Sequence, residues 1–499
     1  MQIIKGNNMK YQFSNSRRKL LIKASSAAIA SQISATSLFA KPNQAQFTLN
    51  NLDEQIIKQA KKLTEGKSVT LSILQPQGSL GNVKPVGDIF SKLTNISINY
   101  IESSLDEINA KILAQSLSNE ISFDIALPAT FGLPDLIEAG SIRDLDEFVD
   151  SYEPTNFYHD MLYPTGDFYK NKFYGYQTDG DTYLMFYNKA WLEDKTEQNN
   201  FKKEYGYPLA VPKTWEQLDQ MTRFFHRPDE NMYGGALFRN KDYIAWEWWT
   251  RFHAKGYYPF NNKLQPQINS DAGVEALTEL LETTNYLYPQ SKTNGLFENW
   301  EAFAEGNMFC NIGWGGTQKY LNGPKSKIKD NLAFGPAPGG IVNNELLHTP
   351  YFNWGWNYTV SSLTKEPEIA YLFTLFACSP KMSTEAVKFA DGYFDPFRSE
   401  HYSDSEIQET YSEPFLAAHK FSMENSIPDL YLTGQGEYWD ILKENIDLAN
   451  RSTLTPKLAL DTTAKAWNQI SARYGVKAQL EQWQFLKSKY PENIRKKLI

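Results

Sequence analysis

The sequence predicts an α/β protein with a parallel, doubly wound sheet and a division into two large lobes. Strand-like and helix-like segments alternate between residues 69 and 127, and this alternation is typical of a parallel sheet. The chain has 499 residues, which is too many for a single ordinary core. Its composition, 41% apolar and 22% charged, is that of a folded soluble protein.

This alternation of strands and helices also predicts where a ligand would bind. The expected strands are Val69–Leu74, Ile96–Tyr100 and Phe123–Leu127, with helices around 83–93 and 105–117 between them and a helix within 41–66 before them. Ligands of such sheets bind beyond the carboxyl ends of the strands, here residues 75–78 and 128–130. Gln75 and Gln77 are therefore candidate ligand contacts, and ordinary loop polarity is the alternative.

The stretch Phe173–Trp191 contains the most informative polar segment. Two strand-like runs, 173–176 and 182–187, are rich in β-branched and aromatic residues and flank it. Gly180 can adopt a positive φ, so we expect a sharp turn that aims Asp179 and Asp181 at one place. This segment could form the floor of a polar cleft.

The remaining elements follow in chain order. Thr214 and Gln217 form a capping box at the start of a helix, and Trp314 stands between glycines at the end of a strand. The other expected elements are a strand at Tyr233–Phe238, a Trp-rich helix at 246–252, a helix at Asp271–Leu281, the strand 307–316, a strand and helix within Thr359–Ala377, and helices beyond 399 with Leu442, Ile446 and Ala449 on one apolar face.

The N-terminus carries an export signal. Ser16–Leu21 resembles the twin-arginine motif, and the run Ala24–Ala40 is too short and too rich in serine for a membrane span. Cleavage is expected near Ala40, and no cysteine stands there to be acylated. We expect a soluble periplasmic protein without stable membrane insertion; a disordered basic tail is the alternative.

The net charge disfavours two classes of binding partner, and the cysteine content bears on disulfide bonding. Loss of residues 1–40 removes six basic side chains and changes the net charge from −8 to about −14. Such an acidic protein does not favour nucleic acid or anionic membranes as partners. Twin-arginine substrates fold in a reducing cytosol, so Cys310 and Cys378 are expected to be buried free thiols.

Several short patterns together resemble the extracellular solute-binding proteins of ABC importers, the sugar-type family that includes maltose-binding proteins. The patterns, which occur in family order, are Phe123-Asp124-Ile125 with Gly140-Ser141-Ile142, Tyr174-Gly175-Tyr176 with Leu184–Lys189, Pro212-Lys213-Thr214-Trp215, Gly306–Trp314, Gly335–Gly340, Trp356–Ser361, and Thr455–Asp461 with Trp467. Each pattern alone is weak, and their order and spacing carry the resemblance.

The resemblance implies a two-lobed periplasmic-binding-protein fold, type II-like, in which each lobe is a doubly wound sheet with helices. The chain would cross the hinge three times, near 181–183, 332–336 and 394–397. Lobe one would hold residues 41–181 and 335–395, and lobe two residues 183–332 and 397–499.

The resemblance also implies ligand-binding residues. Trp314 aligns with the family's ligand-stacking tryptophan, and a core tryptophan is the alternative. Asp181 falls where the family places a ligand-binding acid at the hinge, and a turn-capping aspartate is the alternative. Asp179 is a further candidate.

Three more candidates lie near the other crossings. Trp356 is chosen over Trp354 as the tryptophan that faces the cleft. Arg398 could bind a ligand hydroxyl or carboxylate, or instead pair with a nearby acid, Asp395 or Glu400. Trp246 is a candidate within a tryptophan cluster that is otherwise typical of a core.

The expected function is that of a monomeric, non-enzymatic substrate-binding protein that closes around a carbohydrate or polyol and delivers it to a membrane permease, without metal or cofactor. Delivery to a sensor protein is equally compatible with the sequence. The rival class is an exported glycan-active hydrolase with Asp179 and Asp181 as paired carboxylates. No GxSxG, P-loop, HExxH or GxGxxG motif is present, and the six histidines are scattered.

Overall fold

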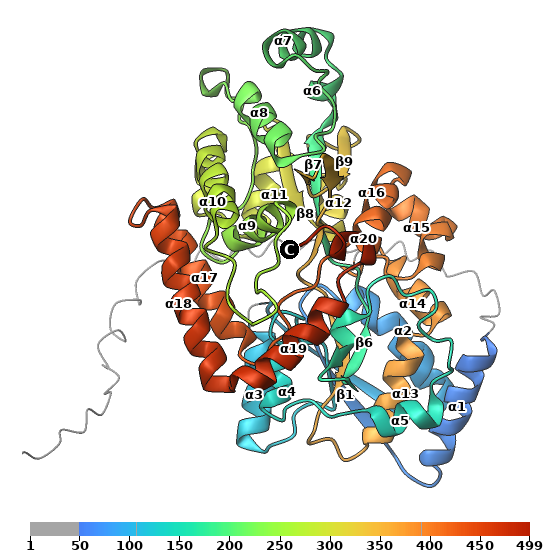
Figure 1. Ribbon diagram of the computed structural model, residues 1–499. Helices are drawn as coiled ribbons and strands as arrows, with labels where there is room; N and C mark the ends of the chain where they lie inside the picture. The colour runs from blue at the N-terminus through green and yellow to red at the C-terminus, as the bar shows by residue number, and fades with distance from the viewer. Residues whose placement is uncertain (1–48, 106, 391) are drawn as a thin grey trace, which may run out of the picture. The chain divides into compact units, whose positions relative to one another are not determined.

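The computed structural model describes residues 49–105, 107–390 and 392–499 (Figure 1). The predicted export signal lies outside these residues. Between 49 and 499 the chain forms two separate main sheets, each with its own helices, and two short hairpins. The hairpins are β4 (Phe168–Tyr169) with β5 (Lys172–Phe173), and β10 (Gly340–Val342) with β11 (Glu345–Leu347).

The first sheet has the strand order β2-β1-β3-β13-β6. Its strands are β1 (Thr70–Pro76), β2 (Ser97–Ser103), β3 (Ile125–Ala126), β6 (Gly175–Gln177) and β13 (Asn357–Val360). β1 is parallel to β2 and β3, which confirms the parallel sheet predicted from the alternation. β13 enters from much later in the chain and pairs antiparallel with both β3 and β6.

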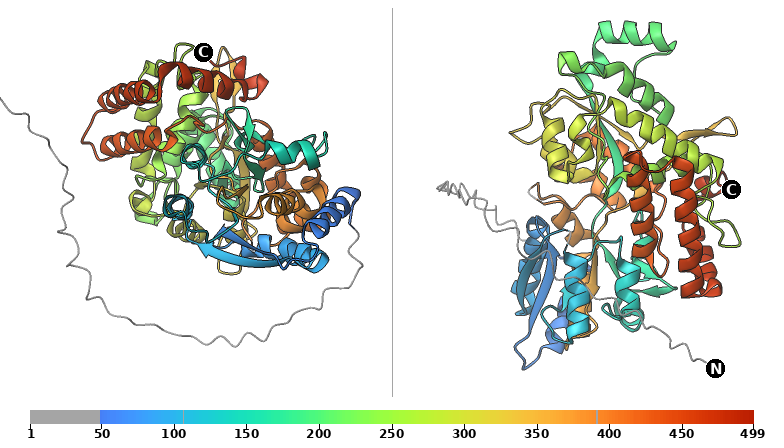
Figure 2. Two further views of the ribbon diagram at one scale, coloured as in Figure 1. Left: turned by 90° about the horizontal axis from the view of Figure 1, so that it is seen from below. Right: turned by 90° about the vertical axis from the view of Figure 1, so that its left-hand side faces the viewer.

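Helices pack against this sheet as two groups, as the layers in Figures 1 and 2 show. The helices are α1 (Asn51–Leu63), α2 (Leu80–Thr94), α3 (Ile108–Ser118), α4 (Leu133–Glu138), α5 (Asp146–Tyr152), α13 (Pro367–Ala377) and α14 (Pro380–Val387). α2 contacts α1, α13 and α14, whereas α3 contacts β1 and α4. The core strand β1 is buried at Leu71 and Ile73 because helices cover it.

The second sheet is built around β7 (Thr182–Asn188), all of whose residues are buried. It pairs antiparallel with β8 (Cys310–Gly313), β9 (Leu332–Pro336) and β12 (Tyr351–Phe352). The expected strand at Tyr233–Phe238 is reduced to isolated bridges from Tyr233 and Ala236. Gly234 lies against the backbone of Thr222, where a Cβ would come within 2.2 Å of the carbonyl oxygen.

The remaining helices include the C-terminal part of the chain. They are α6 (Lys189–Glu193), α7 (Lys195–Tyr205), α8 (Trp215–Phe225), α9 (Ile244–Ala254), α10 (Asp271–Thr283), α11 (Leu296–Ala304), α12 (Gly315–Leu321), α15 (Ser405–Thr410), α16 (Glu413–Glu424), α17 (Gln435–Asn450), α18 (Pro456–Tyr474), α19 (Val476–Ser488) and α20 (Glu492–Arg495). The predicted apolar face of α17 is confirmed, since Leu442, Ile446 and Ala449 are buried.

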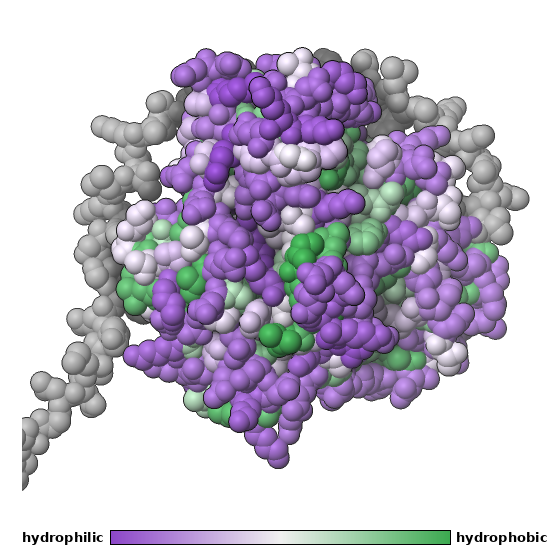
Figure 3. Space-filling model, turned by 45° about the horizontal axis from the view of Figure 1, so that its top comes forward, coloured by the Kyte–Doolittle hydropathy of each residue, from purple (hydrophilic) through white to green (hydrophobic). Residues whose placement is uncertain are grey.

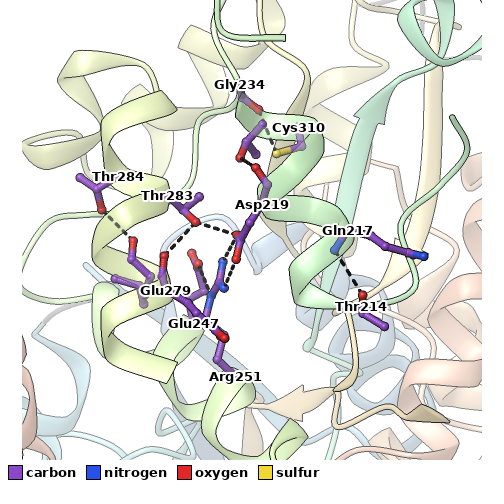
Figure 4. A network of polar contacts seen from close by, with 12 residues as sticks. Thr214, Gln217, Asp219, Gly234, Glu247, Arg251, Glu279, Thr283, Thr284 and Cys310 are labelled. Carbon is purple, nitrogen blue, oxygen red and sulfur yellow. Dashed lines mark hydrogen bonds and ion pairs between the residues drawn. The ribbon is translucent and has the colours of Figure 1, made fainter. Parts of the chain in front are cut away.

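Helix α9 is buried along its whole length, so its charged residues need partners. Glu247 accepts hydrogen bonds from both Arg239 and Arg251. Arg251 also donates to Asp219 (Figure 4), at 2.7 and 2.8 Å. Burial raises the pKa of Glu247, but the two guanidinium groups outweigh burial and lower it. The network ties α8, α9 and the segment before α9 together. The same view shows Thr214 accepting from Gln217 at the predicted start of α8.

Three segments connect the two sheets. Residues 178–181 join β6 to β7, and residues 353–356 join β12 to β13. The third segment, 392–398, follows α14 and leads toward α15 and α16, and α16 contacts β7 and β9. Strand pairing keeps β9 and β12 with the second sheet, so the second connection lies later than residues 332–336. The predicted limits of the lobes stay a prediction.

Both cysteines are buried and free: Cys310 lies on β8, and Cys378 ends α13 beside the first sheet. Burial raises the pKa of both thiols. No helix among the described residues is long and apolar enough to span a membrane. Hydrophilic residues cover most of the face in Figure 3, with apolar residues gathered in smaller patches.

Candidate functional site

A narrow cleft lies where the connecting segments meet. Its open space is about 50 Å³, and it is lined by Leu105, Asp181, Leu296, Phe297, Trp300, Trp314, Gly316, Trp354, Trp356 and Tyr393. Leu105 follows β2 of the first sheet, and the other residues come from the three connections, from α11 and α12, and from Trp314 just before α12. Sites for small molecules are usually several hundred Å³. The indole rings therefore almost fill the cleft in this state.

Trp314 is held in a fixed orientation at the start of α12. Its indole Nε1 donates to Asn353 Oδ1 at 2.9 Å, and its backbone N–H donates to Thr317 Oγ1 at 3.1 Å. Its ring packs at 5.1 Å from Tyr183 and edge-on to Trp354 at 5.5 Å. The residue is only 4% exposed, and that remainder faces the cleft. Trp314 is thus both a packed side chain and part of the wall.

Trp354 and Trp356 both line the cleft, although only Trp356 was chosen from the sequence. The backbone of Trp356 fixes its position. Its carbonyl accepts a hydrogen bond from the Thr178 N–H at 3.0 Å, and the residue forms an isolated β-bridge with Ala129. Trp354 has a buried Nε1 without a hydrogen-bond partner. Gly355 between them is needed because a Cβ there would lie 2.5 Å from the ring of Phe352.

Three aspartates gather beneath the tryptophans. One carboxylate oxygen from each of Asp179, Asp181 and Asp395 lies within 4.8 Å of the others. The Asp395 backbone N–H donates to Asp179 Oδ1 at 2.7 Å. Asp395 itself accepts from Gly315 N–H at 2.7 Å and from the Tyr411 hydroxyl at 2.6 Å. Only Asp181 reaches the cleft, since Asp179 and Asp395 are completely buried.

This cluster is electrostatically unfavourable when every member is ionised. Two unit charges 4.8 Å apart repel by about 3.5 kcal/mol at an effective dielectric constant of about 20. Burial raises the pKa of Asp179 well above its usual value, and the charge of Asp395 raises it further. Burial likewise raises the pKa of Asp181, with the charge of Asp179 adding to it. The group therefore retains a proton or attracts a cation.

The predicted turn at residues 177–181 brings its two acids together, but for a different reason than expected. Gly180 does not adopt a positive φ. A Cβ at this position would lie 2.0 Å from the carbonyl oxygen of Pro396, so glycine allows two connecting segments to touch. Gly315 has a similar role, because a Cβ there would lie 2.1 Å from Asp395 Oδ1.

Gln75 and Gln77 lie at the carboxyl end of β1, as predicted, with opposite environments. Gln75 is fully buried, and neither its Nε2 nor its Oε1 has a hydrogen-bond partner. Gln77 is exposed, and its backbone N–H donates to Ser103 at 2.7 Å. Neither residue lines the cleft in this state. Gly78 beside them packs against Tyr393, which does line it.

Arg398 and Trp246 do not line the cleft either. Arg398 is fully buried and pairs with Asp160, a partner different from the two acids considered from the sequence; it also donates to the Cys378 carbonyl at 2.8 Å. Trp246 packs behind the wall, 6.1 Å from Trp314 and 5.6 Å from Trp354. It supports the wall residues from the core side.

Sequence reasoning missed several residues of the site. Trp300 and Phe297 come from α11, a segment for which no element was predicted from the sequence. Tyr393 and Asp395 stand in the third connecting segment, close to the predicted crossing at 394–397. Polar residues near a predicted crossing were therefore the available signal for Asp395.

Among the described residues, the three aspartates are the group whose atoms lie close enough to share one cation. Their surroundings offer few further oxygen ligands. Both Asp395 oxygens and one Asp179 oxygen accept hydrogen bonds, and the Gly180 carbonyl accepts from His419 Nε2 at 2.8 Å. The wall opposite is made of indole carbon.

The chain resembles known proteins in both sequence and structure. Residues 86–412 match the family described as "Bacterial extracellular solute-binding protein". A relative from Sinorhizobium fredii, named "Probable amino-acid ABC transporter periplasmic-binding protein y4oP", is 22% identical over 311 residues, which are 58% of this chain and 64% of the relative. The chain thus spans just under two thirds of that relative's length.

Two solved structures with a TM-score of 0.67 extend the comparison. An ABC transporter solute-binding protein from Agrobacterium radiobacter in complex with ribitol is 18% identical and covers 81% of this chain and 98% of its own. A maltose-bound protein of T. maritima, MalE3, is 16% identical and covers 81% and 100%. At these identities the likeness shows the fold, which is the predicted two-lobed α/β fold of periplasmic binding proteins.

Proposed function

The chain belongs to the family of bacterial extracellular solute-binding proteins, and from that premise we propose that it is the substrate-binding protein of an ABC importer with a carbohydrate or polyol as its ligand. The observation that carries this proposal is the cleft between the two sheets, walled by four tryptophans with the carboxylate of Asp181 at its floor. Two of the solved structures, one bound to ribitol and one to maltose, support this ligand class, whereas the Sinorhizobium relative is named for an amino-acid transporter.

The wall and floor match the two kinds of surface that a sugar presents. Indole faces cover the C–H faces of a pyranose or polyol, and a carboxylate is a strong acceptor for its hydroxyl groups. Buried polar atoms without partners lie at the same place: Asp179 Oδ2, Asn353 Nδ2, and the Nε1 atoms of Trp300 and Trp354. Leaving such atoms unpaired costs free energy, so a hydroxylated ligand that pairs with them gains affinity.

Binding requires the cleft to open. Its present space of about 50 Å³ is smaller than any sugar, and its walls come from both sheets through three short connections. Rotation about residues 178–181, 353–356 and 392–398 would separate Trp314 from Trp356 and admit the ligand. The closed form is then selected because only there do both walls contact the ligand.

The partner in this proposal is a membrane permease that receives the ligand from the closed protein. The protein acts as a monomer in the periplasm after twin-arginine export and cleavage near Ala40. Family membership supports the compartment, and the name of the Sinorhizobium relative supports the transporter class.

The geometry favours binding over hydrolysis. A glycosidase places two carboxyl groups on opposite sides of the bond that it cleaves, at least about 5 Å apart. Here Asp179 lies buried behind Asp181 on the same side of the cleft. Only one carboxylate can therefore reach a bound sugar.

A thermal-shift screen of the purified protein tests the proposal. Monosaccharides, disaccharides, oligosaccharides and polyols are each added, and at least one is expected to raise the melting temperature by mass action. The hit is then incubated with the protein and followed by chromatography. Recovery of the unchanged ligand is expected, whereas steady release of a product would identify a hydrolase. No shift with any of these compounds would overturn the proposed ligand class.

A further inference from the structure

The cleft has a charge that a neutral sugar does not require. Asp181 is the single charged side chain among the described residues that line it, and the others are aromatic, apolar or glycine. Four indoles and two further aromatic rings surround this carboxylate. Aromatic faces attract cations through their negative π-surface, and a carboxylate adds a full charge to that attraction.

Two further acids lie close to Asp181 on the side away from the cleft. Asp179 and Asp395 lie within 4.8 Å of Asp181, and Asp179 Oδ2 is completely buried without a hydrogen-bond partner. The surrounding N–H and O–H donors reach Asp395 and the other oxygen of Asp179. The protein's own cation on this side is Lys319, whose Nζ donates to the Gly392 carbonyl at 2.7 Å. Three acids thus lie close together with one lysine nearby, and such a cluster either keeps a proton or is stabilised by a positive charge on a ligand.

We propose that the ligand carries a protonated amino group beside its hydroxyl groups, as an aminated sugar or polyol does, and that this group lies between Asp181 and the tryptophan faces. The inference rests on the proposed function and narrows its ligand class. An ammonium group has three donors and no acceptor, so it can pair with the carboxylate of Asp181, the acid of the cluster that reaches the cleft. Its attached carbons pack on the indoles as those of a sugar would.

A bare divalent metal fits this site less well. Calcium takes six to eight oxygen ligands, and magnesium needs a regular octahedron. Three of the six carboxylate oxygens already accept hydrogen bonds from the chain, and the cleft side presents aromatic carbon. An organic cation needs fewer oxygens and uses the aromatic wall.

Occupation by an ammonium group also changes the protonation of the cluster. The titratable groups around the cluster are Asp179, Asp395, Tyr411, Lys319 and His419, and burial lowers the pKa of His419. Burial raises the pKa of Asp181, and an ammonium group beside it would favour the ionised carboxylate and lower that pKa again. Binding of an ammonium group should therefore release protons at any pH at which the empty cluster is still protonated.

Isothermal titration with matched probes tests the inference. Sorbitol is compared with N-methyl-D-glucamine, and D-glucose with D-glucosamine, because each pair differs mainly by an amino group. The aminated member is expected to bind at least tenfold more tightly at pH 7.5, with proton release measured in buffers of different ionisation enthalpy. Asp181→Asn should reduce the ratio of the two affinities to near one. Circular dichroism and the melting temperature verify that this variant is folded.

The possible outcomes separate this inference from the proposed function. If the neutral member binds as tightly as the aminated one, or if Asp181→Asn preserves the ratio, the amino group is not recognised while the polyol-binding function stands. If no neutral or aminated compound binds, the proposed function itself fails. If calcium alone raises the melting temperature and a chelator removes ligand binding, a metal occupies the cluster and the inference is overturned.

Discussion

Replacing Trp314 by alanine should weaken ligand binding by more than tenfold. One face of an indole offers about half of the roughly 200 Å² that an aromatic side chain buries. At about 25 cal/mol per Å², the loss of about 100 Å² corresponds to about 2.5 kcal/mol, or an affinity decrease of about 70-fold. Water and neighbouring side chains that refill the space reduce this value, so a loss above tenfold is the expected result.

The same substitution affects folding, because Trp314 donates to Asn353 and packs on Tyr183. The assay therefore pairs titration of the ligand found by thermal shift with chemical denaturation. Trp467→Phe is the matched control, since Trp467 is fully buried on α18 against Phe260 and does not line the cleft. The control should lose stability and keep its affinity. An alanine variant of Trp314 that is folded and binds within threefold of wild type would refute the stacking role.

Three further perturbations test the structure. Glu247→Gln removes the charge between two buried arginines and should lower the free energy of unfolding, measured in urea, by about 3–5 kcal/mol. The control Glu444→Gln, in an exposed ion pair, should lower it by less than about 1 kcal/mol. Equal losses in the two variants would contradict the role of burial. Gly180→Ala should lower the melting temperature, because its Cβ meets the Pro396 carbonyl; an unchanged melting temperature would show that the segments can move apart at no cost. The raised pKa of Asp179 destabilises the empty protein as the pH rises above the ordinary value of 3.8. Asp179→Asn should therefore raise the melting temperature more at pH 8 than at pH 4, and an equal shift at both pH values would exclude titration as the cause.

Much of the fold was predictable because its signals are local. The alternation over residues 69–127 predicted β1, β2 and β3 and their parallel pairing, since periodicity and turn residues act within short segments. The position of β13 between β3 and β6 could not be predicted from local signals, because the strands it pairs with lie about 180 to 230 residues earlier in the chain. The pairing of β9 and β12 with β7 is also long-range. It keeps both strands in the second sheet, so the second connection lies at residues 353–356 and not at the predicted 332–336.

The kinds of side chain available to the site follow from the amino-acid sequence alone: tryptophans next to glycines, and acids in a short polar turn. The sequence could not determine which of them meet. Asp395 lies beside Asp179 and Asp181 because two connecting segments touch at Gly180. Arg398 does not line the cleft because its guanidinium group pairs with Asp160. Whether a charged or aromatic residue serves a ligand or the core depends on its neighbours in space, and contacts between distant segments are set by the packing of the whole fold.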